Sequence, residues 1–281
     1  MVRENDSCQS KALGELRKRR AFFLLDEIGW NPLKTVSFAT GLSRYIFQFI
    51  RFRARSKKAN IDQDLKLSPI LSDYSKEAGE SRSLYFLQDL SCSQYVLSKT
   101  PRRHIDIGSR LDGFVAQVCA SRPIEVMDIR PNKTQIKNIY FTQADICKLK
   151  PELAESYDLV TSLHALEHIG LGRYGDPIDP SGFTKGLENC RRLARSQGEV
   201  LISLPIASTP KDTTEFNAQR IFSSKTIIET LTHSFVEDDL IWWCACDSSR
   251  RPISGTSTEL LRSTLKEFRG LGFLATSWIK K

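Results

Sequence analysis

Two of the four histidines lie four residues apart, as His164 and His168, with Glu167 between them. A neutral imidazole takes up a proton near neutral pH, so each histidine is a candidate general base. For His168 the alternative is a structural role, in which its ring only braces a loop through a hydrogen bond. A metal-binding pair at this spacing needs helical register and a third ligand, which Glu167 does not clearly supply, so we predict no metal site.

Strand-like and helix-like patterns alternate around these histidines, and the strand before them covers residues 157–163. This alternation predicts an α/β fold with a mostly parallel sheet and helices on both faces. Further strands are expected at residues 104–107, 124–127, 139–141 and 200–204 and near 235–243 and 273–279. Helices are expected at residues 84–98, 112–120 and 223–231 and from Asp179, with Asp179 as N-cap and Pro180 at the first helical position.

The first predicted strand leads into a glycine-containing loop, residues 106–113. Gly108 and Gly113 fit the first and last positions of a G-x-G-x-x-G fingerprint, but Arg110 holds the middle one. In dinucleotide-binding folds the middle glycine lets the backbone approach the pyrophosphate, so Arg110 disfavours NAD and FAD. S-adenosylmethionine, which has no phosphates, tolerates this departure better.

Acidic residues follow the ends of the first three strands. Asp106 lies near the end of the first strand, and Asp128 ends the second, at the spacing of a carboxylate that accepts hydrogen bonds from ribose hydroxyls. Asp145 follows the third strand and is a candidate acceptor for an adenine amino group. For each of these aspartates the alternative is an ordinary turn-forming role.

The segment from Tyr157 to Gly170, an apolar strand followed by L-E-H, resembles class I S-adenosylmethionine-dependent methyltransferases over roughly residues 84–281. The resemblance implies a Rossmann-like class I methyltransferase fold with a seven-stranded sheet, and S-adenosylmethionine as cofactor. The cofactor-binding residues that we predict are Asp106, Gly108, Arg110, Asp112, Gly113, Asp128, Asp145 and Leu163.

A longer segment, His164 to Pro180, is similar to a little-characterised family catalogued as a domain of unknown function. The loop from Asp106 to Phe114 resembles the same family, and so do residues 85–90 and 216–222. Gln219 departs from the pattern, which has His there. The association of this family with polysaccharide-synthesis gene sets implies a sugar or glycan-linked acceptor that is methylated on oxygen. Arg173, Tyr174 and Asp176 are then candidate acceptor-binding residues, unless Arg173 and Asp176 only pair with each other.

The chain has a formal net charge of +8, which is unevenly distributed. Residues 1–60 contain 13 Lys and Arg against 5 Asp and Glu, whereas residues 61–281 contain 28 of each. We therefore expect a basic, partly helical arm (residues 1–60), a linker (61–83) and a neutral methyltransferase-like domain (84–281). A basic amphipathic helix with aromatic residues, at residues 40–58, is typical of contact with an anionic membrane surface. An ordinary surface helix is the alternative.

Two other functions stay open at this point: an RNA methyltransferase that uses the basic arm, and a non-catalytic binding protein with the same fold. The seven cysteines are scattered and form no C-x-x-C, which favours free thiols and a cytoplasmic location, with peripheral attachment to the inner membrane face through the arm. The first residues lack the apolar region of a signal peptide, and none is expected. The sequence names neither the acceptor nor the oligomeric state.

Overall fold

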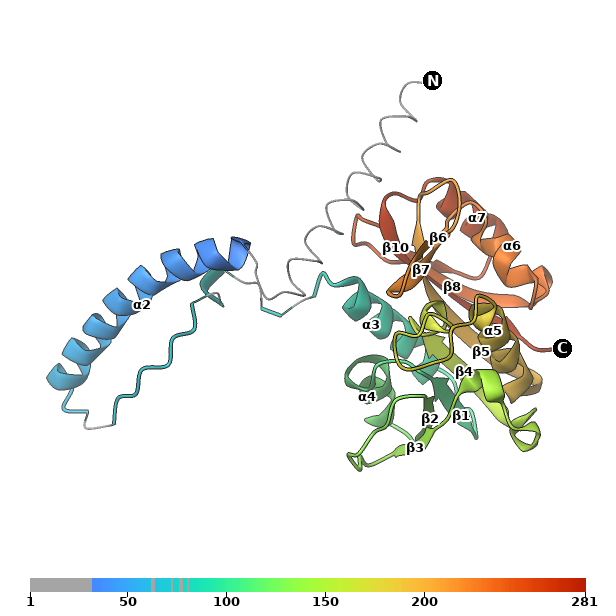
Figure 1. Cartoon of the computed structure of the whole chain (residues 1–281), viewed down its shortest axis with the longest axis horizontal. Helices are drawn as coiled ribbons and strands as arrows, with labels where there is room; N and C mark the ends of the chain where they lie inside the picture. Colours follow the sequence, from blue (N-terminus) through green and yellow to red (C-terminus); the bar gives the residue numbers. More distant parts are fainter. Residues whose placement is uncertain (1–31, 62–63, 72, 76–77, 80) are drawn as a thin grey trace, which may run out of the picture. The chain divides into compact units, whose positions relative to one another are not determined.

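The computed structural model describes residues 32–61, 64–71, 73–75, 78–79 and 81–281 (Figure 1). Residues 1–31 of the predicted basic arm lie outside the described residues. The chain divides into two compact units, residues 1–80 and residues 81–281. The first contains the long helix α2 (Pro32–Lys58), which begins earlier than predicted, and a 3-10 turn, η1 (Asp73–Ser75).

The second unit contains a ten-stranded sheet. Its main path runs β3-β2-β1-β4-β5-β10-β8-β9, and β7 pairs with β5 and β6. The strands are β1 (His104–Ile107), β2 (Ile124–Asp128), β3 (Ile139–Gln143), β4 (Tyr157–Leu163), β5 (Ala194–Ala207), β6 (Thr213–Glu215), β7 (Gln219–Ser223), β8 (Leu240–Cys246), β9 (Ile253–Gly255) and β10 (Leu271–Ile279). The five strands from β3 to β5 are mutually parallel, whereas β10 runs antiparallel to both β5 and β8.

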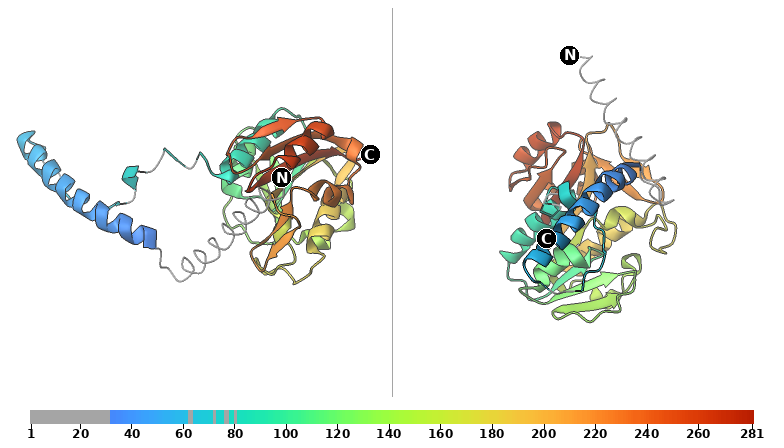
Figure 2. Two further views of the ribbon diagram at one scale, coloured as in Figure 1. Left: turned by 90° about the horizontal axis from the view of Figure 1, so that it is seen from above. Right: turned by 90° about the vertical axis from the view of Figure 1, so that its left-hand side faces the viewer.

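Helices cover both faces of this sheet (Figures 1 and 2). Strand side chains alternate between two apolar clusters: Leu159 and Leu201 belong to one, and their neighbours Val160 and Val200 to the other. This period of two is that of a strand buried on both faces. Helices α3 (Leu84–Leu97) and α4 (Ala116–Cys119) contribute to the first cluster, and α5 (Gly182–Leu193), α6 (Ile227–Thr232) and α7 (Thr258–Lys266) to the second.

Two predicted helix starts are wrong. Helix α5 begins at Gly182 with Ser181 as N-cap, because the carboxylate of Asp179 accepts from the Ser181 N–H and from Lys185 instead of capping a helix there. Helix α6 begins at Ile227, because Ser223 still belongs to β7. In the predicted strand at residues 235–243, a 3-10 turn (Glu237–Asp239) precedes β8. Strands β6, β7 and β9 and helix α7 were not predicted.

Candidate functional site

A cavity of about 300 Å³ lies at the carboxyl ends of β1, β2, β3 and β4. This is where ligands bind in open α/β sheets. Helix α3 contributes Tyr85 to the wall, and the loop after β4 contributes Arg173, Tyr174 and Asp176. The remaining lining residues are Ile107, Gly108, Arg110, Met127, Asp128, Ile129, Arg130, Ala144, Asp145, Ile146, His164, Ala165, His168 and Ile169. All of them lie in the second unit.

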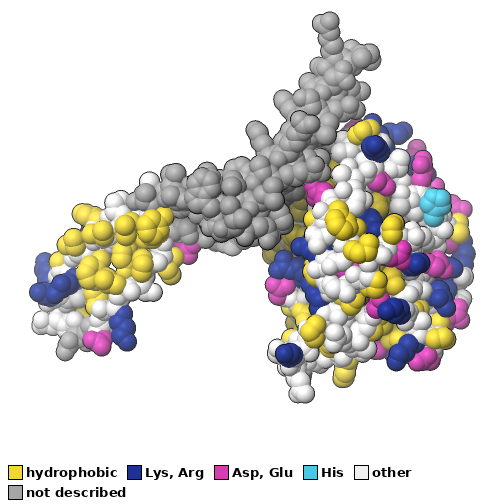
Figure 3. All heavy atoms as spheres, in the orientation of Figure 1, with side chains coloured by type: hydrophobic (Ala, Val, Ile, Leu, Met, Phe, Trp, Pro, Cys, Tyr) yellow, Lys and Arg dark blue, Asp and Glu magenta, His cyan; other side chains and the backbone are white. Residues whose placement is uncertain are grey.

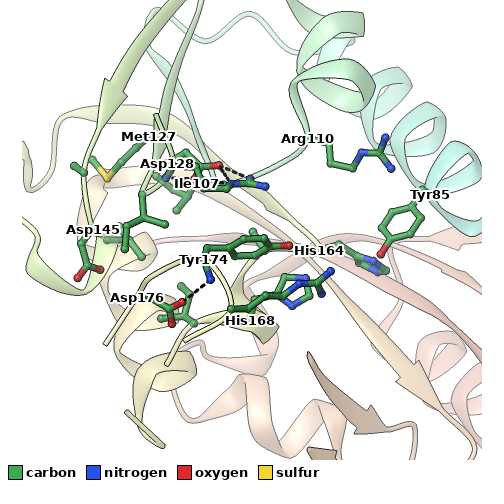
Figure 4. Close-up of a pocket in the computed structure, with 18 residues that line it drawn as sticks. Tyr85, Ile107, Arg110, Met127, Asp128, Asp145, His164, His168, Tyr174 and Asp176 are labelled. Carbon is green, nitrogen blue, oxygen red and sulfur yellow. Dashed lines mark hydrogen bonds and ion pairs between the residues drawn. The ribbon is translucent and has the colours of Figure 1, made fainter. Parts of the chain in front are cut away.

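The two ends of the cavity differ in chemistry (Figure 4). Asp128 and Asp145 lie at one end, which we call the carboxylate end. His164 and Tyr85 lie at the other, which we call the histidine end. Tyr174 lies between them. Apolar side chains from β2 and from the segment after β3 line the carboxylate end, namely Met127, Ile129, Ala144 and Ile146.

At the carboxylate end the protein itself satisfies the acidic groups. Asp128 accepts from the Arg130 backbone N–H at 2.8 Å and from the Arg130 guanidinium, with Nε at 3.0 Å from Oδ1. Asp145 caps a 3-10 turn, η3 (Ile146–Lys148), by accepting from the Cys147 N–H at 2.9 Å. The Arg130 guanidinium also lies 4.5 Å from the centre of the Tyr174 ring, so it connects Asp128 to the loop after β4.

At the histidine end several buried polar atoms have no hydrogen-bond partner among the described residues. They are both ring nitrogens of His164 and both carboxyl oxygens of Glu167. Glu167 Oε1 lies 3.9 Å from His164 Nδ1 and 3.7 Å from His168 Nε2. Burial raises the pKa of Glu167 to about 8 and lowers the pKa values of His164 to about 3 and of His168 to about 4. At pH 7 all three groups are therefore mainly neutral.

The two histidines are held differently. His168 Nδ1 lies 2.7 Å from the Ala218 carbonyl oxygen, so Nδ1 carries the proton and Nε2 faces Glu167. The His164 ring makes no hydrogen bond to a described residue, whereas its backbone N–H donates to Ser203 O at 3.0 Å and its φ is +47°. A positive φ is strained for a residue with a side chain, and such strain is frequent at functional sites. Of the two rings, only that of His164 has both nitrogens without a hydrogen-bond partner among the described residues.

Four of the predicted cofactor-binding residues do not line the cavity. Asp106 is fully buried beneath the loop, where it accepts from Ser109 and Thr161. Burial raises the pKa of Asp106 to about 7, although these hydrogen bonds act in the opposite direction. Asp112 pairs with Arg110 on the surface, and Gly113 lies so close to Asp89 that a Cβ would be 2.1 Å from its Oδ2. The Leu163 side chain is buried in the core.

The predicted acceptor-binding residues Arg173, Tyr174 and Asp176 all line the cavity, but their hydrogen-bond partners differ. Asp176 accepts from the backbone N–H groups of Gly170, Gly172 and Tyr174, so it shapes the loop. Arg173 donates to the Ala218 carbonyl oxygen at 2.9 Å, and no ion pair with Asp176 is found. Gln219, the departure from the family pattern, bonds Glu215 and does not line the cavity.

The sequence did not point to Tyr85 or Arg130 as cavity residues. Tyr85 contacts His164 edge to face, with ring centroids 5.1 Å apart. Arg220 was also missed: it donates to the carbonyl oxygens of Glu167 and Ile169 and so fixes the segment that carries the histidines. The only signal for Arg130 was its position two residues after Asp128, the spacing that allows the bidentate pair.

The model of a family described as "Caenorhabditis protein of unknown function, DUF268" matches residues 122–236 of this chain. The match includes β2 to α6 and the whole segment from His164 to Asp176. The resemblance predicted from the sequence is confirmed for residues 164–180 and 216–222, whereas residues 85–90 and 106–114 lie outside the match. A comparison with curated proteins finds no match.

Several solved structures are similar in fold. The 1,6-didemethyltoxoflavin-N1-methyltransferase of Burkholderia thailandensis is 13% identical and has a TM-score of 0.47, over 69% of this chain and 77% of that one. The N-methyltransferase NodS of Bradyrhizobium japonicum is 16% identical with a TM-score of 0.42, over 69% and 84%. The [4+2]-cyclase SpnF is 10% identical with a TM-score of 0.46, over 68% and 80%. The parallel strand order β3-β2-β1-β4-β5 of this chain is itself a Rossmann-like arrangement.

Proposed function

We propose that this protein is an S-adenosylmethionine-dependent methyltransferase whose acceptor binds at the histidine end of the cavity. The observation that carries the proposal is a single cavity at the strand ends with carboxylates at one end and an unpartnered neutral imidazole at the other. Methylation of a hydroxyl needs both parts, one to hold the adenosine of the cofactor and one to take the proton of the acceptor hydroxyl.

The carboxylate end fits the adenosyl part of the cofactor. A carboxylate at the end of the second strand, as at Asp128, accepts from ribose hydroxyls, and the apolar side chains around Ile129 and Ile146 suit a flat base. Gly108 fits a close backbone approach, because its φ is +70° and a Cβ there would lie 3.0 Å from the Ala165 Cβ. When bound, the cofactor supplies an electrophilic methyl group on a sulfonium.

His164 is the base that we favour. As the acceptor oxygen gains the methyl group, its O–H bond breaks and the proton passes to the free nitrogen of His164. The products are the methyl ether, the uncharged thioether and an imidazolium. Glu167 lies close enough to stabilise that imidazolium when its carboxyl group is ionised. His168 is less free to act, since its Nδ1 is committed to Ala218.

A hydroxyl of a sugar or a glycan-linked intermediate is the acceptor that we propose. Tyr85, Tyr174 and Arg173 offer hydroxyl and guanidinium groups around the histidine end, which suit a polyhydroxylated ligand. Further support for the glycan comes from the family resemblance.

The test is transfer of labelled methyl from S-adenosylmethionine to separated glycan, small-molecule and RNA fractions. Label in the glycan fraction, lost in His164→Asn, is the expected result. Label in the RNA fraction would indicate a nucleic-acid acceptor instead of a glycan. Binding of S-adenosylmethionine without transfer to any fraction would favour a non-catalytic binding protein.

A further inference from the structure

Helix α2 presents an apolar stripe that the other described residues of the first unit leave exposed. Phe38, Leu42, Ile46 and Ile50 recur every fourth residue and therefore share one side of the helix. Their exposed fractions are 57%, 37%, 50% and 61%. A helix of a globular protein normally buries such a stripe against a core, so a continuous exposed one indicates a partner.

The charge on α2 has one sign. The helix contains no acidic residue, and its basic residues are Lys34, Arg44, Arg51, Arg53, Arg55, Lys57 and Lys58. At 100° per residue, Arg44, Arg51, Arg55 and Lys58 lie on the side away from the stripe. In Figure 3 apolar side chains gather in one patch on α2, and Lys and Arg side chains lie toward its C-terminal end.

Part of the first unit packs on α2 without covering the stripe. The Tyr45 hydroxyl accepts from the Ser68 N–H at 3.0 Å, Arg44 lies over the Tyr74 ring at 3.7 Å, and Gly41 is in close contact with Leu71. The segment after α2 therefore occupies a neighbouring surface. These contacts within the first unit leave the stripe uncovered.

We propose that α2 binds an anionic lipid bilayer as an interfacial helix, with the apolar stripe in the acyl boundary and the basic side chains at the headgroups. Electrostatics distinguish this partner from two others. A second copy of α2 would bring seven basic residues against seven more with no acidic residue to pair them. A nucleic acid would pair with the basic side but leave the apolar stripe in water. In the part of the chain that the structure describes, no helix is long and apolar enough to cross a membrane.

The experiment is co-sedimentation of the full chain with vesicles of phosphatidylcholine alone or with equal parts of phosphatidylglycerol. We expect binding to the mixed vesicles only. Arg51→Gln, Arg55→Gln and Lys58→Gln together should weaken it about fivefold per charge. Ile46→Ser with Ile50→Ser should weaken it about tenfold or more. Gln48→Ser with Ala54→Ser, which changes exposed positions outside the stripe, should not.

Failure of the wild-type chain to bind the mixed vesicles, or unchanged binding by the Ile46→Ser, Ile50→Ser variant, would overturn the proposal. The proposal would also be overturned if the wild-type chain formed an oligomer without vesicles and this variant dissociated it. The same holds if the wild-type chain bound RNA and not vesicles. Circular dichroism and S-adenosylmethionine affinity, which depends on residues 81–281, control for folding. Vesicle binding does not require the proposed function, so the two can fail separately.

Discussion

The two ends of the cavity differ in whether their polar groups have hydrogen-bond partners within the protein. At the carboxylate end, Asp128 and Asp145 already accept hydrogen bonds from Arg130 and from the Cys147 backbone, so their positions are fixed before a ligand arrives. At the histidine end, His164 and Glu167 are buried with unpartnered polar atoms. Leaving such a group unpaired costs about 1–3 kcal/mol. The difference indicates that the first end is pre-organised for recognition, whereas the second gains its partners only from a bound molecule or a proton.

The strongest way to separate the two ends is His164→Asn. Loss of a positioned base reduces transfer by roughly 100- to 10,000-fold. The affinity for S-adenosylmethionine should stay within about threefold of wild type, because the cofactor contacts lie at the other end. Initial rates with saturating cofactor and calorimetric titration measure the two effects. A variant that loses cofactor binding and transfer together would show that the two ends are not separate.

Glu167→Gln tests the buried carboxyl group at the histidine end. Because the pKa of Glu167 is raised from 4.5 to about 8, the folded chain keeps a proton that the unfolded chain releases. The free energy of unfolding of the wild type should therefore fall as pH rises from about 4.5 to 8, relative to Glu167→Gln. The total change is on the order of a few kcal/mol. Urea unfolding at a series of pH values measures it, and parallel curves for the two proteins would contradict the assignment.

Asp128→Asn and Asp106→Asn form a matched pair, because Asp128 lies at the carboxylate end whereas Asp106 is buried outside the cavity. Replacing a carboxylate that receives ribose hydroxyls should weaken S-adenosylmethionine binding by roughly 10- to 100-fold, about 1.5–3 kcal/mol. Asp106→Asn should mainly lower stability, by about 1–3 kcal/mol, because Asp106 holds Ser109 and Thr161 below the cavity. Calorimetry and thermal unfolding separate the two. The reverse ranking would mean that Asp106 is the cofactor ligand.

The smallest effect is expected from Asp112→Asn. Asp112 and Arg110 form an exposed ion pair, and such pairs contribute little. The affinity for S-adenosylmethionine should change by less than about twofold. A tenfold loss, measured by the same titration, would place Asp112 among the cofactor contacts after all.

The strand-to-helix alternation predicted the five parallel strands and helix α3 well. Short apolar runs bounded by turn residues are typical of buried strands. Periodicity could not give the direction of β10, which depends on pairing with β5 and β8. The short strands β6 and β9 contain three residues each, too few for a period to show. The predicted start of α5 at Asp179 was wrong because the Asp179 carboxylate accepts a hydrogen bond from Lys185 and does not cap a helix.

For the site, position along a strand was not enough. Asp106 and Asp128 both lie at strand ends, yet only Asp128 lines the cavity, because Thr161 on the neighbouring strand β4 holds Asp106. That contact joins residues 55 positions apart and has no local signal. Tyr85 was missed for the same reason, since its approach to His164 depends on how α3 packs. His164 and Asp128 were found because they directly follow predicted strands, and His168 because it lies four residues after His164.

The central claim is that the carboxylate end holds S-adenosylmethionine while the histidine end stays free for an acceptor. Calorimetric titration of the intact chain with S-adenosylmethionine, beside Asp128→Asn and His164→Asn, tests it most directly. The account predicts saturable binding that is weakened by Asp128→Asn and kept by His164→Asn. No binding by the wild-type chain, or equal affinity in the Asp128→Asn variant, would contradict it.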